Sequence, residues 1–192
     1  MNFTRRQFIE SLAMLGLLYL VTPGNLLQAG TIPLRPPGAL PERDFNLKCI
    51  RCFKCGQACR AQAIRFGGWT EGQLADTPVL SALRTNPCTL CMECNKVCSS
   101  GALRSVPASL PVISKKVKIG VATIDKSRCV LWSEKRPKCL MCKRSCPYEG
   151  EAITADEKGR PVIHPDKCVG CGRCEQLCPV EPAAIVVKGV SS

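Results

Sequence analysis

Sixteen cysteines in a chain of 192 residues limit the fold of this chain more than any other feature of the sequence. They form four groups of four, called motifs 1 to 4 below, and none is left over. Three motifs have the spacing C-x2-C-x2-C-x3-C, whereas in motif 3 nine residues separate the first two cysteines. In chain order the motifs are Cys49, Cys52, Cys55 and Cys59; Cys88, Cys91, Cys94 and Cys98; Cys129, Cys139, Cys142 and Cys146; and Cys168, Cys171, Cys174 and Cys178.

This spacing is typical of iron–sulfur ligation. Three thiolates within seven residues wrap a tight loop around three irons of a [4Fe-4S] cube, and the fourth cysteine reaches the cluster of a partner motif. The motifs therefore work in pairs, and the sequence predicts four [4Fe-4S] clusters with all sixteen cysteines as iron ligands. Spacing alone allows motif 1 to pair with 2 and 3 with 4, or 1 with 4 and 2 with 3.

Three other uses of cysteine fit the pattern less well. Zinc sites use paired C-x2-C knuckles or Cys/His sets with longer spacers. Disulfides are common in small exported chains, but cysteines three residues apart, repeated four times, suit a metal better than a framework of disulfide bridges. A redox-active C-x2-C of the thioredoxin type would occur once rather than four times. The chain has only nine aromatic residues, too few to fill an ordinary core of this size, so a bound group is expected to hold the fold together.

The surroundings of the motifs indicate a repeated unit. An alanine and an aliphatic residue follow the fourth cysteine of every motif: Ala63-Ile64, Ala102-Leu103, Ala152-Ile153 and Ala184-Ile185. Strand-like stretches at 121–124 and 161–163 precede motifs 3 and 4, whereas 74–83 has a weak helical pattern. We predict a loop-rich α+β fold of two pseudo-symmetric bacterial-ferredoxin-like modules built around four clusters.

The first 29 residues have the features of an export signal. Thr4-Arg5-Arg6-Gln7-Phe8-Ile9 matches the twin-arginine pattern, and the apolar run that follows is too short to span a bilayer. A buried core helix is the alternative. We expect export of the folded protein to the periplasm by the twin-arginine translocase, with 1–29 as a signal or an uncleaved anchor. The proline-rich residues 30–47 are expected to form a tether or a segment laid over the domain at 48–192.

The positive charge suits the proposed cofactors. Residues 1–29 contribute two arginines and one glutamate to the formal charge of +12, so the remainder carries +11. Four clusters with their thiolates bring about −8, which offsets most of that excess. A basic stretch at 115–144 predicts docking of an acidic redox partner or a solvated loop, and no nucleic-acid-binding motif accompanies it.

No constellation for substrate turnover is present, so we expect an electron carrier rather than an enzyme. The single histidine, His164, stands just before motif 4 and is expected to be structural. Trp69 and Trp132 are expected to shield a cluster by packing.

Two further segments resemble a known family. Leu34-Arg35-Pro36-Pro37-Gly38-Ala39, followed by Cys49-Ile50-Arg51-Cys52-Phe53-Lys54-Cys55, is similar to the NapG/MauM-type ferredoxin-like proteins. Asn95-Lys96-Val97-Cys98-Ser99-Ser100-Gly101-Ala102-Leu103, the interrupted motif 3 and the leader resemble that family too.

The resemblance implies a four-cluster protein on the outer face of the bacterial inner membrane. Its partners would be a membrane-bound quinol-oxidising or cluster-bearing protein and a periplasmic acceptor, a cytochrome or a molybdenum enzyme such as nitrate reductase. Alternative functions are an electron-transfer subunit of a larger exported oxidoreductase and a maturation factor for an exported metalloenzyme.

Analogy with iron–sulfur subunits of molybdenum oxidoreductases implies nested pairing of the motifs. An outer module would then combine 48–66 with 160–190, and an inner module would span 84–155. The implied ligand sets are Cys49, Cys52, Cys55 and Cys178; Cys168, Cys171, Cys174 and Cys59; Cys88, Cys91, Cys94 and Cys146; and Cys129, Cys139, Cys142 and Cys98.

Overall fold

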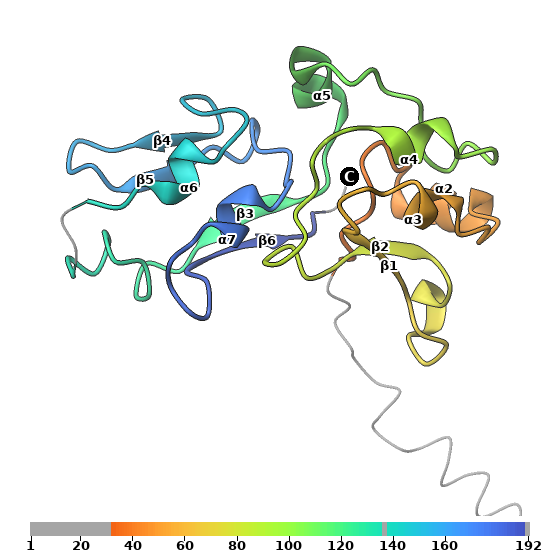
Figure 1. Ribbon diagram of the computed structural model, residues 1–192, viewed down its shortest axis with the longest axis horizontal. Helices are drawn as coiled ribbons and strands as arrows, with labels where there is room; N and C mark the ends of the chain where they lie inside the picture. The colour runs from red at the N-terminus through yellow and green to blue at the C-terminus, as the bar shows by residue number, and fades with distance from the viewer. Residues whose placement is uncertain (1–31, 136–137, 191–192) are drawn as a thin grey trace, which may run out of the picture. The chain divides into compact units, whose positions relative to one another are not determined.

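A computed structural model describes residues 32–135 and 138–190 of the chain (Figure 1). The expected leader at 1–29 lies outside these residues. The helices are α2 (Glu42–Lys48), α3 (Lys54–Gln57), α4 (Glu93–Lys96), α5 (Leu110–Lys116), α6 (Met141–Arg144) and α7 (Arg173–Gln176), with a 3-10 turn η2 (Gly72–Leu74). The strands are β1 (Ile64–Phe66), β2 (Pro78–Leu80), β3 (Val121–Ile124), β4 (Ile153–Ala155), β5 (Pro161–Ile163) and β6 (Ile185–Lys188).

The strands form three antiparallel pairs of two. Around motifs 3 and 4, the inner strands β4 and β5 pair with each other, and the outer strands β3 and β6 pair along their full lengths. Around motifs 1 and 2, β1 pairs with β2, and an isolated antiparallel bridge joins Ala39, before motif 1, to Leu103, after motif 2. In the half that contains motifs 1 and 2 and in the half that contains motifs 3 and 4, an inner pair of strands is therefore enclosed by an outer backbone pairing.

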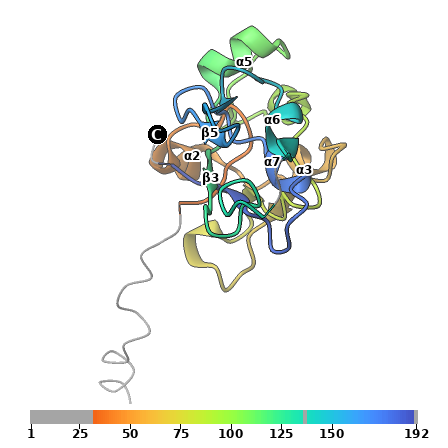
Figure 2. The ribbon, with the colours of Figure 1, turned by 90° about the vertical axis from the view of Figure 1, so that its left-hand side faces the viewer.

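Four of the helices are single turns that carry the third cysteine of a motif: α3 holds Cys55, α4 Cys94, α6 Cys142 and α7 Cys174. α3 packs beside α4, and α6 packs beside α7. The second contact is visible from two directions (Figures 1 and 2). The helices of neighbouring motifs thus lie together in each half.

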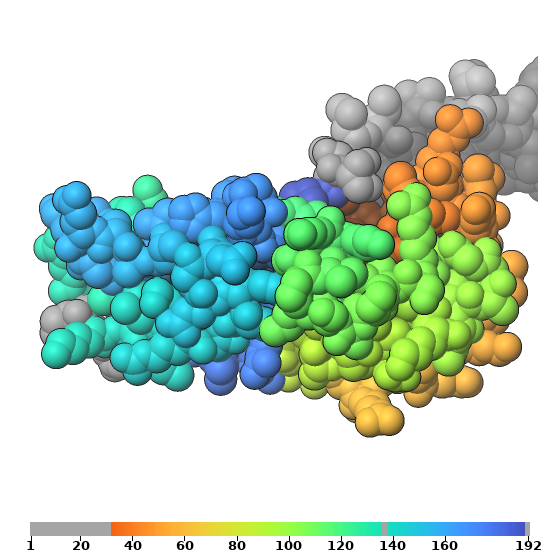
Figure 3. Space-filling model, turned by 90° about the horizontal axis from the view of Figure 1, so that it is seen from above, coloured from red at the N-terminus to blue at the C-terminus, as the bar shows by residue number. Residues whose placement is uncertain are grey.

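Cysteines form part of the apolar core. The larger buried cluster includes Cys88, Cys168, Cys171, Cys174 and Cys178 among aliphatic side chains. A smaller one surrounds the fully buried Phe45 of α2 and includes Cys94. The longer helix α5 lies at the surface (Figure 3) with Ile113 buried beneath it. The prediction of a loop-rich α+β fold is confirmed.

The proline-rich segment is laid over the domain rather than extended away from it as a tether. The Arg35 guanidinium is buried, donates hydrogen bonds to Thr77 Oγ1 at 2.8 Å and the Pro78 carbonyl at 2.9 Å, and stacks over the Phe45 ring at 4.5 Å. Part of the segment also forms α2, which has acidic residues in its first turn and Lys48 in its last, as the helix dipole favours.

The helical pattern predicted for 74–83 is wrong. Residues 78–80 of this segment form β2 instead, with Val79 opposite Arg65 of β1 and all three strand residues buried, and Leu74 ends the 3-10 turn η2. Burial on both sides of the short strand outweighs the weak local preference for a helix. Among the described residues, no helix has the length and apolarity needed to cross a membrane.

Candidate metal centres

A left-handed residue shapes the loop of every motif. Phe53, Met92, Leu140 and Gly172 have φ values of 61°, 60°, 53° and 85°, and each stands directly after the second cysteine of its motif. The reversal of the chain at this residue starts the single-turn helix that carries the third cysteine. This reversal turns the first three thiols of a motif toward one space. The left-handed backbone is strained at Phe53, Met92 and Leu140, because these residues are not glycine.

The fourth cysteine of each motif lies with the first three of the neighbouring motif. We name the resulting groups sites A to D. Site A contains Cys49, Cys52, Cys55 and Cys98; site B contains Cys59, Cys88, Cys91 and Cys94; site C contains Cys146, Cys168, Cys171 and Cys174; and site D contains Cys129, Cys139, Cys142 and Cys178.

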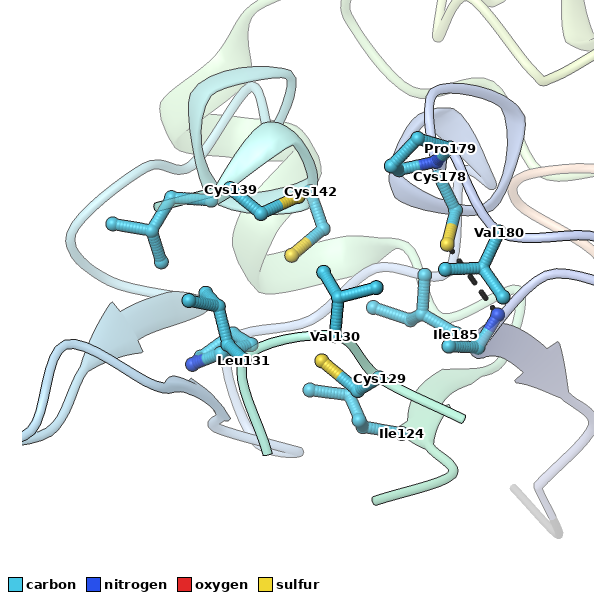
Figure 4. Close-up of a pocket in the computed structure, with 13 residues that line it drawn as sticks. Ile124, Cys129, Val130, Leu131, Cys139, Cys142, Cys178, Pro179, Val180 and Ile185 are labelled. Carbon is cyan, nitrogen blue, oxygen red and sulfur yellow. Dashed lines mark hydrogen bonds between the residues drawn. The ribbon is translucent and has the colours of Figure 1, made fainter. Parts of the chain in front are cut away.

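Site D illustrates the geometry (Figure 4). The thiols of Cys129, Cys142 and Cys178 point into one cavity from three different segments of the chain, with Cys139 on its wall. The remaining lining is apolar and includes Val130, Leu131, Leu140 and Ile185. Sulfur ligands in an apolar pocket suit a metal–sulfide cluster better than a polar substrate.

Sites A and C are built in the same way. Site A is lined by Phe45, Phe66 and Leu103 as well as its four cysteines, and site C by Tyr148, Ile153 and Val187. The empty spaces at D, A and C, counted with the open solvent at their mouths, are about 380, 360 and 320 Å³. The three sites are therefore similar in size and in chemistry.

Site B is identified by the mutual influence of its thiols. Burial, together with the neighbouring thiol charges of Cys171, Cys59 and Cys91, raises the pKa of Cys88 to about 12. Burial also raises the pKa of Cys94, as do the charges of Cys88, Cys55, Cys91 and Cys59, so Cys59 acts on both buried thiols of motif 2. The fourth cysteine of motif 1 is thus close to the first three of motif 2.

The nested pairing implied by analogy is wrong for this structure. Cys178 lies with motif 3 rather than motif 1, and Cys98 lies with motif 1 rather than motif 3. The physical reason is the strand pairing, because β3 with β6 and β4 with β5 bring motifs 3 and 4 together. The outer module of 48–66 with 160–190 and the inner module of 84–155 are not the units that the strands form.

Backbone amides donate to the cysteine sulfurs. The N–H of Leu103 donates to Cys98 Sγ, and the N–H of Ala184 donates to Cys178 Sγ, both at 3.3 Å. Burial raises the pKa of Cys98, but hydrogen bonds to its sulfur lower it more, the strongest of them from the N–H of Leu103. The net pKa of Cys98 therefore lies below the usual value of a thiol. Amides directed at sulfur stabilise the negative charge of a thiolate ligand and of a cluster.

Burial has the opposite net effect on several other ligands. It raises the pKa of Cys142 to about 12, and those of Cys55 and Cys171 to about 11. Buried thiols in this range hold their protons at neutral pH unless a metal cation replaces them, so metal binding is coupled to proton release. All sixteen cysteines have free thiols in the structure.

The four sites fit [4Fe-4S] clusters. Within residues 32–135 and 138–190, no three His, Cys, Asp or Glu side chains come close enough together to hold a single metal ion. The thiols instead surround larger spaces, as ligands at the corners of a cube do. Each site offers four sulfur ligands, the number that a [4Fe-4S] cluster requires.

Sites B and C meet where the two halves of the domain touch. The N–H of Cys88 in site B donates to the carbonyl of Cys171 in site C at 2.9 Å. Arg84, four residues before Cys88, donates to the carbonyls of Glu175 and Cys178, both at 2.6 Å. A shares motifs 1 and 2 with B, and D shares motifs 3 and 4 with C. The order of the sites is therefore A, B, C, D.

The tryptophans and the histidine have different surroundings. Trp69 is 88% exposed, so the prediction that it shields a cluster is wrong. Trp132 is held between Lys126 and Arg160, which lie 4.3 and 4.1 Å from its ring centre, and its Nε1 donates to the Pro161 carbonyl. It packs the nine-residue insertion of motif 3 against β5. The ring of His164 shares a 2.8 Å hydrogen bond with Thr154 Oγ1, which agrees with a structural role.

Comparison with known proteins agrees with this chemistry. The family model described as a 4Fe-4S dicluster domain matches residues 48–102 and 135–181. These two segments contain motifs 1 and 2, and motifs 3 and 4 without Cys129. The match covers more than half of the chain.

Several curated proteins are similar to this chain. The methylamine utilization ferredoxin-type protein MauM of Methylophilus methylotrophus is 38% identical over 123 residues, which are 63% of this chain and 52% of MauM. The ferredoxin-type protein NapG of Escherichia coli K12 is 36% identical over 132 residues, 67% of this chain and 54% of NapG. NapG of Haemophilus influenzae is 32% identical over 167 residues, 81% of this chain and 57% of that protein.

The chain spans about half the length of these curated relatives. The alignments and the family model nevertheless agree on one type of protein. The chain belongs to the 4Fe-4S dicluster domain family, as a member of the NapG/MauM ferredoxin-type group.

Proposed function

We propose that the chain is an electron-transfer protein that holds one [4Fe-4S] cluster at each of sites A to D. The observation that carries the proposal is the continuous order of the four sites, with B and C joined by the 2.9 Å hydrogen bond from Cys88 to Cys171. The sites at the two ends of this order and the two in its middle all offer four cysteine ligands, so a cluster at each site can exchange an electron with a cluster at the next.

Two ferredoxin-like modules account for this order. The first contains sites A and B, and the second contains sites C and D. In both, an inner strand pair lies inside an outer pairing, β1–β2 inside Ala39–Leu103 and β4–β5 inside β3–β6. The matching connectivity supports a pseudo-symmetric pair of modules.

The clusters supply one-electron chemistry, and the chain supplies position, insulation and charge. At site D, Val130, Leu131 and Ile185 exclude water from the sulfur ligands. The N–H groups of Leu103 and Ala184 stabilise added negative charge beside sites A and D. Lys118 donates to the Cys168 carbonyl at 2.8 Å and places a positive charge next to site C. Such donors and cations raise a cluster's reduction potential.

The donor and acceptor follow from the family and the expected leader. We propose a membrane-bound quinol-oxidising or cluster-bearing donor and a periplasmic acceptor, either a cytochrome or a molybdenum reductase such as nitrate reductase. The names of the relatives, methylamine utilization ferredoxin-type protein and ferredoxin-type protein, support electron transfer in such a chain. Export of a folded protein by the twin-arginine translocase suits a carrier that receives its clusters before export.

An anaerobic redox titration of the purified protein, followed by electron paramagnetic resonance, tests the proposal. We expect about sixteen irons per chain and four one-electron reductions, several at potentials that a quinol can reach; iron–sulfur potentials range from roughly −700 to +450 mV. Clusters that all lie far below the quinol couples would exclude a quinol-linked donor. Protein prepared without oxygen that gives no cluster signal would contradict the whole proposal.

A further inference from the structure

We propose that the surface of residues 47–54, over site A, is the docking surface for an acidic redox-partner protein and the place where electrons cross between the two proteins. This inference rests on the proposed electron-transfer function. It places the exchange of electrons at site A, one end of the order A to D, and it implies that the contact surface of the partner is negatively charged.

Site A has the thinnest cover among the three sites with a defined cavity. Ile50, Arg51, Cys52 and Phe53 all line the cavity and are also exposed on the outside. At site D only Pro179 combines the two properties, and at site C no lining residue is exposed. All sixteen cysteines lie in the described part of the chain, and Cys52 is the one that is exposed. Because electron transfer slows steeply with distance, site A is the favoured exchange point.

The same surface has an exposed apolar centre. Leu47, Ile50 and Phe53 are 77%, 64% and 40% exposed, and they come from the end of α2 and the loop of motif 1. The edge of the Phe53 ring meets Phe66 of β1, with ring centres 4.5 Å apart, so Phe53 is supported from behind. Apolar side chains held in this way around a cluster ligand suit a protein interface, which has an apolar core.

Three cations surround the apolar side chains. Lys48, Arg51 and Lys54 are exposed, and the segment 47–54 contains no acidic residue. Within residues 32–135 and 138–190, none of the three forms an ion pair with another side chain. Glu42 is bound to Arg35 and Glu71 to Arg65, whereas Asp44, one turn before Lys48 on α2, forms no ion pair with another side chain in the described part of the chain. A partner with acidic residues around an exposed cofactor edge complements this arrangement and is steered to it.

Charge reversal tests the surface. The variant K48E/K54E changes two exposed side chains outside the lining of site A, and the matched control K158E/K188E makes the same change of net charge in the β4–β5 turn and on β6, where the side chains are also exposed. Reduced flavodoxin, an acidic flavoprotein, serves as the electron donor in anaerobic stopped-flow experiments. Dithionite reduction of each variant verifies that all clusters are present.

We expect the flavodoxin concentration at half-saturation to rise at least tenfold in K48E/K54E, with a limiting rate within about twofold of the wild type, and the control to change less than threefold. The difference should vanish at high ionic strength, since surface charges are then screened. Separating half-saturation from the limiting rate distinguishes docking from a shift in cluster potential. Leu47→Ser should weaken docking without this salt dependence.

Two results would overturn the inference. Equal effects of the two double variants would mean that net charge, rather than this surface, steers the donor. Unchanged electron transfer combined with lost binding to phosphatidylglycerol vesicles would make the surface a membrane contact. Neither result bears on the proposed electron-transfer function, which the redox titration of the wild-type protein tests separately.

Discussion

Gly170, in the loop of motif 4, has no space for a side chain. It stands between Cys168 and Cys171 with φ +80°, and an added Cβ would lie 2.4 Å from the backbone nitrogen of Gly120. Gly150 has nearly the same φ, +82°, but an added Cβ there would meet nothing within 4 Å. The two glycines therefore separate backbone strain from steric conflict.

We predict that Gly150→Ala lowers the free energy of unfolding by about 1–2 kcal/mol, the cost of a left-handed alanine. Gly170→Ala should cost about 1–3 kcal/mol more, because the atoms in conflict are backbone and cannot move aside easily. Anaerobic urea unfolding followed by circular dichroism measures both. Equal losses in the two variants would show that the contact with Gly120 is not rigid.

The exchange of fourth cysteines between neighbouring motifs is testable by counting iron. We predict that Cys52→Ala combined with Cys98→Ala removes one cluster and leaves about twelve of sixteen irons, because both residues belong to site A. Cys91→Ala combined with Cys98→Ala should remove two clusters and leave about eight. Under nested pairing the first double variant would also leave about eight, so iron and acid-labile sulfide analysis decides between the two arrangements.

Sequence spacing predicts three ligands of each site but not the fourth. Cys49, Cys52 and Cys55 are neighbours along the chain, so their grouping is local and can be recognised from the motif. Cys98 joins them only because β1 pairs with β2 and Ala39 pairs with Leu103. Those are contacts between distant segments, and two pairings of the motifs satisfy the same spacing.

At the scale of elements, α7 depends on a side chain from the other half of the domain. The carbonyls of Glu175 in its last turn and of Cys178 just beyond it accept hydrogen bonds from Arg84, which also donates to the Val180 carbonyl. A single-turn helix has few internal hydrogen bonds, so outside donors are needed to satisfy its end. Arg84 therefore fixes the end of α7 and the approach of site B to site C together.

We predict that Arg84→Ala lowers the free energy of unfolding by about 1–3 kcal/mol, because partly buried carbonyls lose their donor. Arg65→Ala is the matched control, since Arg65 pairs with Glu71 at the surface and an exposed pair contributes about 0–1 kcal/mol. Urea unfolding under anaerobic conditions compares the two. A loss for Arg84→Ala no greater than that of the control would exclude a structural role for these hydrogen bonds.

Some elements were predictable from local sequence and others were not. The strands β3 and β5 follow from their β-branched residues at 121–124 and 161–163. Local sequence does not predict β2, because the strand forms only by pairing with β1 across the hairpin. The prolines before motif 1 correctly indicate an extended chain, but its attachment to the domain depends on Arg35, whose partners Thr77 and Pro78 lie more than 40 residues away.

At the scale of the whole molecule, the order A, B, C, D predicts which clusters interact magnetically. In the fully reduced protein, neighbouring clusters couple and broaden each other's signals. Cys91→Ala should empty site B, leave site A without a neighbour, and give one uncoupled electron paramagnetic resonance signal beside the coupled pair C and D. Cys52→Ala should empty the terminal site A and leave three coupled clusters. An uncoupled signal in Cys52→Ala would place site A between two others.

The exchange of fourth cysteines also links cluster binding to the stability of the chain. A cluster bound at each site would tie two motifs together and close the chain into interlocked loops, such as that from Cys55 to Cys98. Loss of one cluster would open its loop and release the local chain to proteases. Electron transfer and resistance to proteolysis would then be lost in the same event.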